Sequence, residues 1–177
     1  MASHAELVHL FGEDNVINLD ANASAARGIS AEDAKVLAEV GLPTFVDVLF
    51  TLKVHGPPKI FTVLPVGSGS ESVNIFILGS PTDSPELRYF LDLKRGYVVL
   101  LSRGPDGPQA EIVNSSLTQF IEFLYRVALH KQSTAEATAE ERSRGAYDLH
   151  AYLAERDSMA FAAPDSWWSI VLNALKQ

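Results

Sequence analysis

The sequence contains no cysteine, and this absence excludes a wide range of chemistry. Disulfide bonds, a thiol nucleophile and thiolate-based zinc or iron–sulfur sites all need cysteine side chains. The sequence also lacks any apolar run near about eighteen residues, the length from which a transmembrane helix is inferred. Its first residues, MASHAELVHLFGED, show no basic leader followed by an apolar stretch and a small-residue cleavage site. We therefore expect no membrane contact, and the cytoplasm is the simplest location.

Positive charge is also scarce. The chain has 14 Lys and Arg against 22 Asp and Glu, a formal net charge of −8 at pH 7. No cluster of basic residues interrupts this acidity, and acidic surfaces repel phosphate, so nucleic-acid binding is not expected. A basic protein partner would be attracted, and the attraction would speed its encounter with the chain. Acidity that serves solubility alone is an equally good interpretation of the same number.

Familiar catalytic and cofactor-binding motifs are missing too. The sequence has no phosphate-binding P-loop, and Gly67-Ser68-Gly69 lacks the spacing of a dinucleotide-binding motif. It contains neither the G-x-S-x-G of many serine hydrolases nor the HExxH of zinc proteases. None of the histidines pair at i, i+4 on a predicted helix; they are His4, His9, His55, His130 and His150. We therefore predict no catalytic residue, no metal-binding residue, no cofactor-binding residue and no cofactor.

What the sequence does contain is a series of strand patterns that leads into one amphipathic helix. Runs of β-branched and aromatic residues, bounded by Gly, Pro and Asp, predict strands at 59–66, 73–79, 86–93, 97–102 and 110–113. The links KRG and GPDGP are too short for parallel crossovers and predict hairpins. Ser116-x-x-Gln119 is a capping box that predicts a helix over 116–129. One antiparallel sheet with a covering helix is the expected core.

The segment before the sheet predicts two helices. Residues 3–12 form the first, which ends at a glycine. Ser30 caps the second, Gly41 fits the left-handed position that ends it, and Pro43 forbids its continuation. Residues 44–54 are apolar and are expected to be either extended or looped.

The segment after the sheet also predicts two helices. A capping box at Ser133-x-x-Glu136 predicts a helix over 133–157, and the pattern of 166–177 predicts the last one. Trp168 lies on the apolar face of that last helix and is expected in the core. Without any linker long enough to separate two units, residues 1–177 are expected to form one domain.

Two polar residues next to these elements are expected to have local roles. Asp92 precedes the KRG turn, where its carboxylate is expected to accept backbone amides. Asn114 stands just before the helix at 116–129 and is interpreted as a local capping group.

Several phrases of the sequence resemble, in the same order, segments of bacterial immunity proteins of the SUKH superfamily, specifically its fourth subfamily. The phrases are AKVLAEVGLP (34–43), IFILG (75–79), LDLKRGYVVLL (91–101), IVNSSLTQFIEFL (112–124) and PDSWWSIVLNAL (164–175). The residues at positions that match the family's pattern are Gly41, Pro43, Gly79, Asp92, Gly96, Asn114 and Trp168. The stretch 133–147 matches no part of that pattern.

The resemblance implies an α+β fold with a single central, mostly antiparallel sheet of about five or six strands and helices packed around it. It also implies a function without catalysis. Family members are taken to bind and neutralise a cognate protein toxin, often a nuclease or a nucleic-acid deaminase, by covering its working surface. Because such toxins must grip phosphate, the expected partner is a basic protein.

Four acidic residues in or beside predicted turns are expected to contact such a partner: Asp83, Glu86, Asp106 and Glu111. Solubilising charge explains each of them, taken alone, equally well. Two other functions stay open. One is a regulatory protein-binding scaffold of the same superfamily, and the other is an enzyme or a small-molecule sensor that uses the concave side of the sheet. An enzyme would require a pocket with convergent polar groups and perturbed carboxylates.

Overall fold

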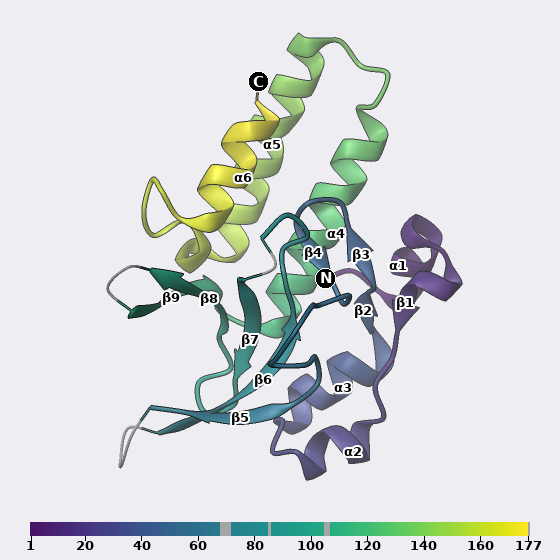
Figure 1. Ribbon diagram of the computed structural model, residues 1–177. Helices are drawn as coiled ribbons and strands as arrows, with labels where there is room; N and C mark the ends of the chain where they lie inside the picture. The colour runs from purple at the N-terminus through teal and green to yellow at the C-terminus, as the bar shows by residue number, and fades with distance from the viewer. Residues whose placement is uncertain (68–71, 85, 105–106, 177) are drawn as a thin grey trace.

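A five-stranded antiparallel sheet forms the centre of the computed structural model, which describes residues 1–67, 72–84, 86–104 and 107–176. Its strands neighbour one another in chain order (Figure 1): β5 (Val63–Val66), β6 (Val73–Gly79), β7 (Arg88–Asp92), β8 (Val98–Gly104) and β9 (Gly107–Asn114). Every neighbouring pair is antiparallel. The α+β fold predicted from the sequence, with these five segments in one sheet, is therefore confirmed.

The first strand is shorter than predicted. The expected range was 59–66, but the regular pairing begins at Val63. Phe61 has a φ of 59°, in the left-handed region, and such a residue cannot continue a strand. Its amide still donates to the carbonyl oxygen of Ile77 at 2.7 Å, so the preceding turn stays attached to β6.

Alternate side chains divide the sheet into two apolar faces. One face belongs to the main core and packs under helix α4 (Leu117–Ser133), where the rings of Tyr89 and Phe120 have centroids 5.0 Å apart. The other face carries a smaller cluster made by Ile75, Ile77, Phe90 and Val99. Among the residues that the structure describes, no helix packs against this smaller cluster.

Helix α4 begins where the sequence predicts and ends later. The hydroxyl of Ser116 accepts the amide of Gln119 at 3.2 Å, as expected of the cap. The helix then continues to Ser133, so the predicted helix start at Ser133 is wrong. Helix α5 (Ala139–Arg156) instead begins at a second capping box made by Thr138 and Glu141. The segments that begin at Ser133 and at Thr138 both have the spacing of a capping box. Because α4 continues through Ser133, the next helix begins at the second of them.

A buried polar network joins β9 to the end of α5 and to helix α6 (Trp167–Leu175). Trp168 is fully buried, and its Nε1 donates to Oδ1 of Asn114 at 2.9 Å. Nδ2 of Asn114 donates to Oδ2 of Asp157 at 3.0 Å, and the same oxygen accepts the amide of Ser115 at 2.8 Å. The prediction that Asn114 is a local cap is therefore wrong, because its partners lie 43 and 54 residues away.

A second buried polar group, Glu122, ties the start of the chain to α4 and α5. The residue is 1% exposed, and its carboxylate accepts hydrogen bonds from the amide of Ala2, from Nε of Arg126 at 2.8 Å and from the hydroxyl of Tyr152 at 2.9 Å. Burial alone would raise the pKa of Glu122, but the hydrogen bonds from Arg126 and Tyr152, with the nearby positive charges, hold it below its usual value. The carboxylate is therefore stabilised in its charged form.

The segment before the sheet forms α1 (His4–Phe11), η1 (Glu13–Asn15), β1 (Val16–Ile17), α2 (Ala21–Ala26), α3 (Ala31–Glu39) and β2 (Leu42–Pro43). The two predicted helices are present, and Pro43 pairs with Val16 in a small sheet of β1 and β2. Gly41 has a φ of 85°, and a Cβ atom there would lie 2.8 Å from the carbonyl oxygen of Ile17. Helix α2 was not predicted; the side chain of Asp20 caps it.

The apolar stretch 44–54 contains a hairpin of β3 (Phe45–Val46) and β4 (Phe50–Thr51). Two backbone hydrogen bonds between Thr51 and Ser80, of 2.8 and 3.1 Å, attach it to the end of β6. A Cβ atom at Gly79 would lie 2.6 Å from the carbonyl oxygen of Thr51. The glycine is therefore required because β4 approaches so closely.

The turn between β7 and β8 agrees with the sequence. Oδ1 of Asp92 accepts the amides of Lys94 at 2.8 Å and Arg95 at 2.9 Å, and Gly96 has a φ of 76°. After β9 and α4, the short helix η3 (Ser158–Phe161) leads from α5 towards α6. Each described helix is too short or too polar to pass through a lipid bilayer.

Candidate functional site

Of the four acidic residues predicted to contact a partner, the three that the structure describes line three different grooves. Asp83 is exposed and lines a groove beside α6, whereas Glu86 is exposed and lines a groove on the face of the sheet that carries no helix. Glu111 is half-buried beside β9 in a third groove. Asp106 lies outside the described residues. The structure therefore does not gather the three described carboxylates into one cluster.

The groove on the open face of the sheet, called here the sheet groove, has a volume of about 560 Å³. Ile75 and Ile77 form part of its apolar lining, and Glu86 and Arg88 supply charges of opposite sign. Arg88 donates from Nη2 to the carbonyl oxygen of His55 at 2.8 Å, so its guanidinium holds the preceding loop against β7. Nowhere in the described residues do three His, Asp or Glu side chains come together as a metal site would need.

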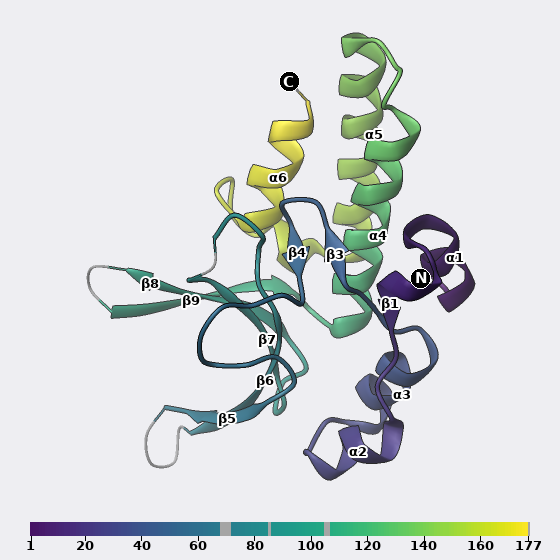
Figure 2. The same cartoon turned by 45° about the vertical axis from the view of Figure 1, so that its right-hand side comes forward.

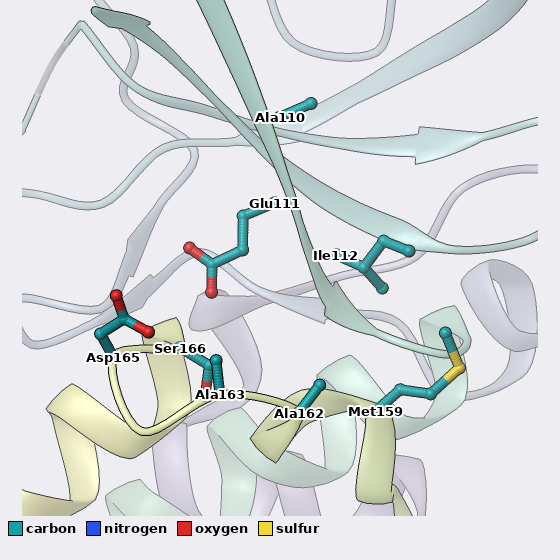
Figure 3. A pocket seen from close by; sticks show the side chains of 8 residues that line it. All are labelled: Ala110, Glu111, Ile112, Met159, Ala162, Ala163, Asp165 and Ser166. Carbon is teal, nitrogen blue, oxygen red and sulfur yellow. The ribbon is translucent and has the colours of Figure 1, made fainter.

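The groove beside β9 holds Glu111 in a structural position. Figure 3 shows its carboxylate pointing from the strand towards the loop before α6, near Asp165 and Ser166. Oε1 of Glu111 accepts the amide of Trp167 at 2.6 Å, while the hydroxyl of Ser166 donates to the carbonyl oxygen of Ala160 at 2.9 Å. Glu111 therefore caps α6 from a strand 56 residues earlier in the chain.

Two further grooves are lined in part by residues of the β3–β4 hairpin. The hairpin stands between α6 and α4 in Figure 2. The α6 groove, of about 430 Å³, includes Val48, Pro81, Asp83, Ile170 and Leu175 in its lining. The α1 groove, of about 360 Å³, includes Phe11, Phe45 and Asp47. Both are also lined by Leu49, Val127 and Lys131, so they form one continuous surface. Lys131 and Asp47 form an ion pair on it.

Large apolar side chains are exposed on this surface. Phe45 is 53% exposed, Val48 46% and Ile170 56%. We call these three residues and the two grooves the hairpin surface. It combines open apolar side chains with a few charged groups, and contiguous exposed apolar patches are features of interaction sites.

Hydrogen bonds hold the tip of the hairpin to the body of the protein. Oγ1 of Thr82 donates to the carbonyl oxygen of Asp47 at 2.7 Å. The amide of Thr82 donates to the carbonyl oxygen of Val48 at 3.0 Å. The hydroxyl of Tyr89 donates to the carbonyl oxygen of Leu49 at 3.0 Å. Burial raises the pKa of Tyr89 well above its usual value, so this phenol stays protonated and remains a donor. The exposed side chains thus stand on a fixed backbone.

Most of the net negative charge lies in the first part of the chain. Residues 1–50 have eight acidic side chains against two basic ones, a net −6 of the total −8. All of these acidic residues except Asp33 are exposed. The segment forms α1, η1, β1, α2, α3, β2, β3 and the start of β4, and in both views α2 and α3 lie below the β3–β4 hairpin, near β5 (Figures 1 and 2). Of these acidic residues, Asp47 lies on the hairpin itself, and Glu13 and Asp14 follow Phe11 of the α1 groove in the chain.

The sequence analysis did not predict the concentration of charge in residues 1–50 or the β3–β4 hairpin, for two different reasons. The charge imbalance could be read from the sequence, but only the total was used. The hairpin was harder to find, because its turn, Val46-Asp47-Val48-Leu49, contains no glycine, asparagine or proline. Asp47 adopts a φ of 44° there, which aspartate tolerates better than most residues.

The comparisons with known proteins identify one family. A family model described as SUKH-4 immunity protein matches residues 2–174, nearly the whole chain. Among curated proteins and among solved structures, no significant match was found.

Proposed function

Because the chain belongs to the SUKH-4 immunity protein family, we propose that it binds and neutralises a cognate protein toxin of the nuclease or deaminase type. It acts by occlusion, covering the active site or the nucleic-acid-binding surface of the toxin, and it carries out no reaction of its own. The family match over residues 2–174 is the observation that carries this proposal.

The charge distribution supports a basic partner. A toxin that acts on nucleic acid grips phosphate with Lys and Arg, and the exposed carboxylates of residues 1–50 attract such a surface. Asp83 and Glu86 are exposed and available for contact. Glu111 already caps α6, and its contribution to binding is expected to be smaller than theirs.

Co-expression tests this function directly. Basic nuclease and deaminase toxin domains encoded beside genes for this family are expressed in bacteria with and without the protein. One of them is expected to arrest growth alone and to lose this effect when the protein is present. The Asp83→Lys, Glu86→Lys variant is expected to protect less well than the Glu136→Lys, Glu140→Lys control, which makes the same charge change at exposed positions. Absence of protection against every toxin would overturn the proposal.

A further inference from the structure

We propose that the hairpin surface is the docking site of the toxin, which inserts an apolar side chain into the α6 groove and sets Lys or Arg side chains against Asp83. This inference rests on the proposed function, because it names the surface that such a partner uses. Three observations support it: the exposed apolar side chains of this surface, the fixed shape of the hairpin and the charge of the groove linings.

The exposed apolar side chains mark a surface that has a use. Scattered apolar residues are normal on soluble proteins, but contiguous ones that border a groove indicate a binding site. Val48 of the hairpin and Ile170 of α6 both line the α6 groove, and Phe45 lines the adjoining α1 groove. The volume of the α6 groove lies within the roughly 300–1,000 Å³ that is typical of ligand-sized sites. An apolar side chain of a partner would complete this part of the surface.

The hairpin is fixed in shape before any partner arrives. Three successive carbonyl oxygens at its tip, those of Asp47, Val48 and Leu49, accept hydrogen bonds from Thr82 and Tyr89. The ion pair of Asp47 with Lys131 fixes the same turn to α4. A partner therefore has little to order on binding, and less of its binding free energy is lost to conformational entropy.

Charge identifies the occupant as basic. Among the described residues that line the two grooves, Asp47 and Asp83 are the acids and Lys131 is the single base, already paired with Asp47. Beyond Phe11 of the α1 groove, the chain continues into the exposed Glu13 and Asp14. A second copy of this chain would bring another net charge of −8 to the same place, so self-association is opposed.

The test uses substitutions whose added charge should strengthen toxin binding but whose loss of an apolar contact should weaken it. Val48→Glu and Ile170→Glu each add negative charge, which attracts a basic toxin more strongly, but each places a carboxylate where an apolar contact is proposed. Tyr147→Glu makes the same charge change at another exposed residue, on α5, outside the linings of both grooves. The probe is the toxin from which the wild-type protein protects cells, purified as a catalytically inactive variant.

We expect the toxin to dissociate from Val48→Glu and from Ile170→Glu at least about tenfold faster than from the wild type, as for loss of a central apolar contact. The toxin should dissociate from Tyr147→Glu at the same rate as from the wild type. Thermal unfolding confirms that each variant folds, and the two positions lie on different elements, so one folded variant suffices.

Two results would overturn the docking site while the immunity function stands. One is wild-type or tighter binding by both groove variants. The other is a wild-type dimer in solution that Val48→Glu dissociates, which would assign the surface to a second copy. If the wild type protects against no toxin, the proposed function fails first, and the docking site fails with it.

Discussion

Residues 1–50 and residues 51–177 use their carboxylates in different ways. In the first region, the carboxylates of Glu6, Asp20 and Asp33 accept hydrogen bonds from residues three positions away, and most of the acidic side chains remain exposed. In the second region, Glu111, Glu122 and Asp157 accept hydrogen bonds from distant elements. The net charge follows the same division, at −6 and −2.

The difference shows that one net charge can describe two kinds of acid. A buried carboxylate with distant partners determines which elements meet, and its removal leaves those partners unpaired. An exposed carboxylate contributes to a field that a partner experiences at long range, and its removal leaves the fold intact. The net charge of −8 for the whole chain therefore does not reveal that six of these charges belong to residues 1–50 and only two to residues 51–177.

The largest expected effect comes from breaking the Asn114–Asp157–Trp168 network. Trp168→Ala removes a fully buried ring and leaves Oδ1 of Asn114 without its donor. Loss of a buried tryptophan typically lowers the free energy of unfolding by about 3–5 kcal/mol. Trp167→Ala, at a half-buried neighbour, should lower it by less, as measured by chemical denaturation. Equal losses for the two variants would show that the network contributes no more than ordinary packing.

A smaller, pH-dependent effect is expected at Glu122. Its pKa in the folded protein lies below the ordinary value of 4.5, so its stabilising effect is present above that value and is lost as the pH falls through the folded pKa. Glu122→Gln should lower the free energy of unfolding at neutral pH by about 1–3 kcal/mol, because Arg126 and Tyr152 lose their charged acceptor.

Measuring the free energy of unfolding across pH separates the charge of Glu122 from its packing. The difference between the wild type and Glu122→Gln should narrow as the pH is lowered below 4.5. Glu136→Gln, at an exposed position, serves as the control and should match the wild type at every pH. A difference that stays constant from neutral to acidic pH would assign the loss to packing and not to the charge.

Local patterns in the sequence predicted most of the fold. Strand composition, hairpin links and the Ser116 and Ser30 caps act over a few residues, so the sequence shows them directly. The errors arose where two local patterns competed or where a partner was distant. The boxes at Ser133 and Thr138 look alike, and the packing of α4 selects the second. Asn114 has the composition of a cap, but Trp168 and Asp157 bind both ends of its amide.

The candidate site was less predictable from the sequence for the same physical reason. The position of Glu111 in the sequence suggests an exposed turn residue, yet the start of α6 comes to lie beside it and takes its carboxylate. The hairpin surface depends on residues from α1, the β3–β4 hairpin, α4 and α6, and no local pattern relates these segments. Exposure of Phe45 and Val48 could be known only from the fold.

The smallest effect on stability, and a clear one on binding, is expected from the exposed acids of residues 1–50. The triple variant Glu13→Gln, Asp14→Asn, Glu32→Gln removes three negative charges from exposed positions within residues 1–50. Its free energy of unfolding should stay within about 0.5 kcal/mol of the wild type. Association with the inactive toxin should slow several-fold at low salt, while dissociation changes little, because these charges act during the encounter. Glu136→Gln, Glu140→Gln, Glu155→Gln makes the same charge change at exposed positions in the second region and should slow association less. If the two triple variants slow association equally, with the same salt dependence, then total charge governs the encounter and the division between the two regions has no role in binding.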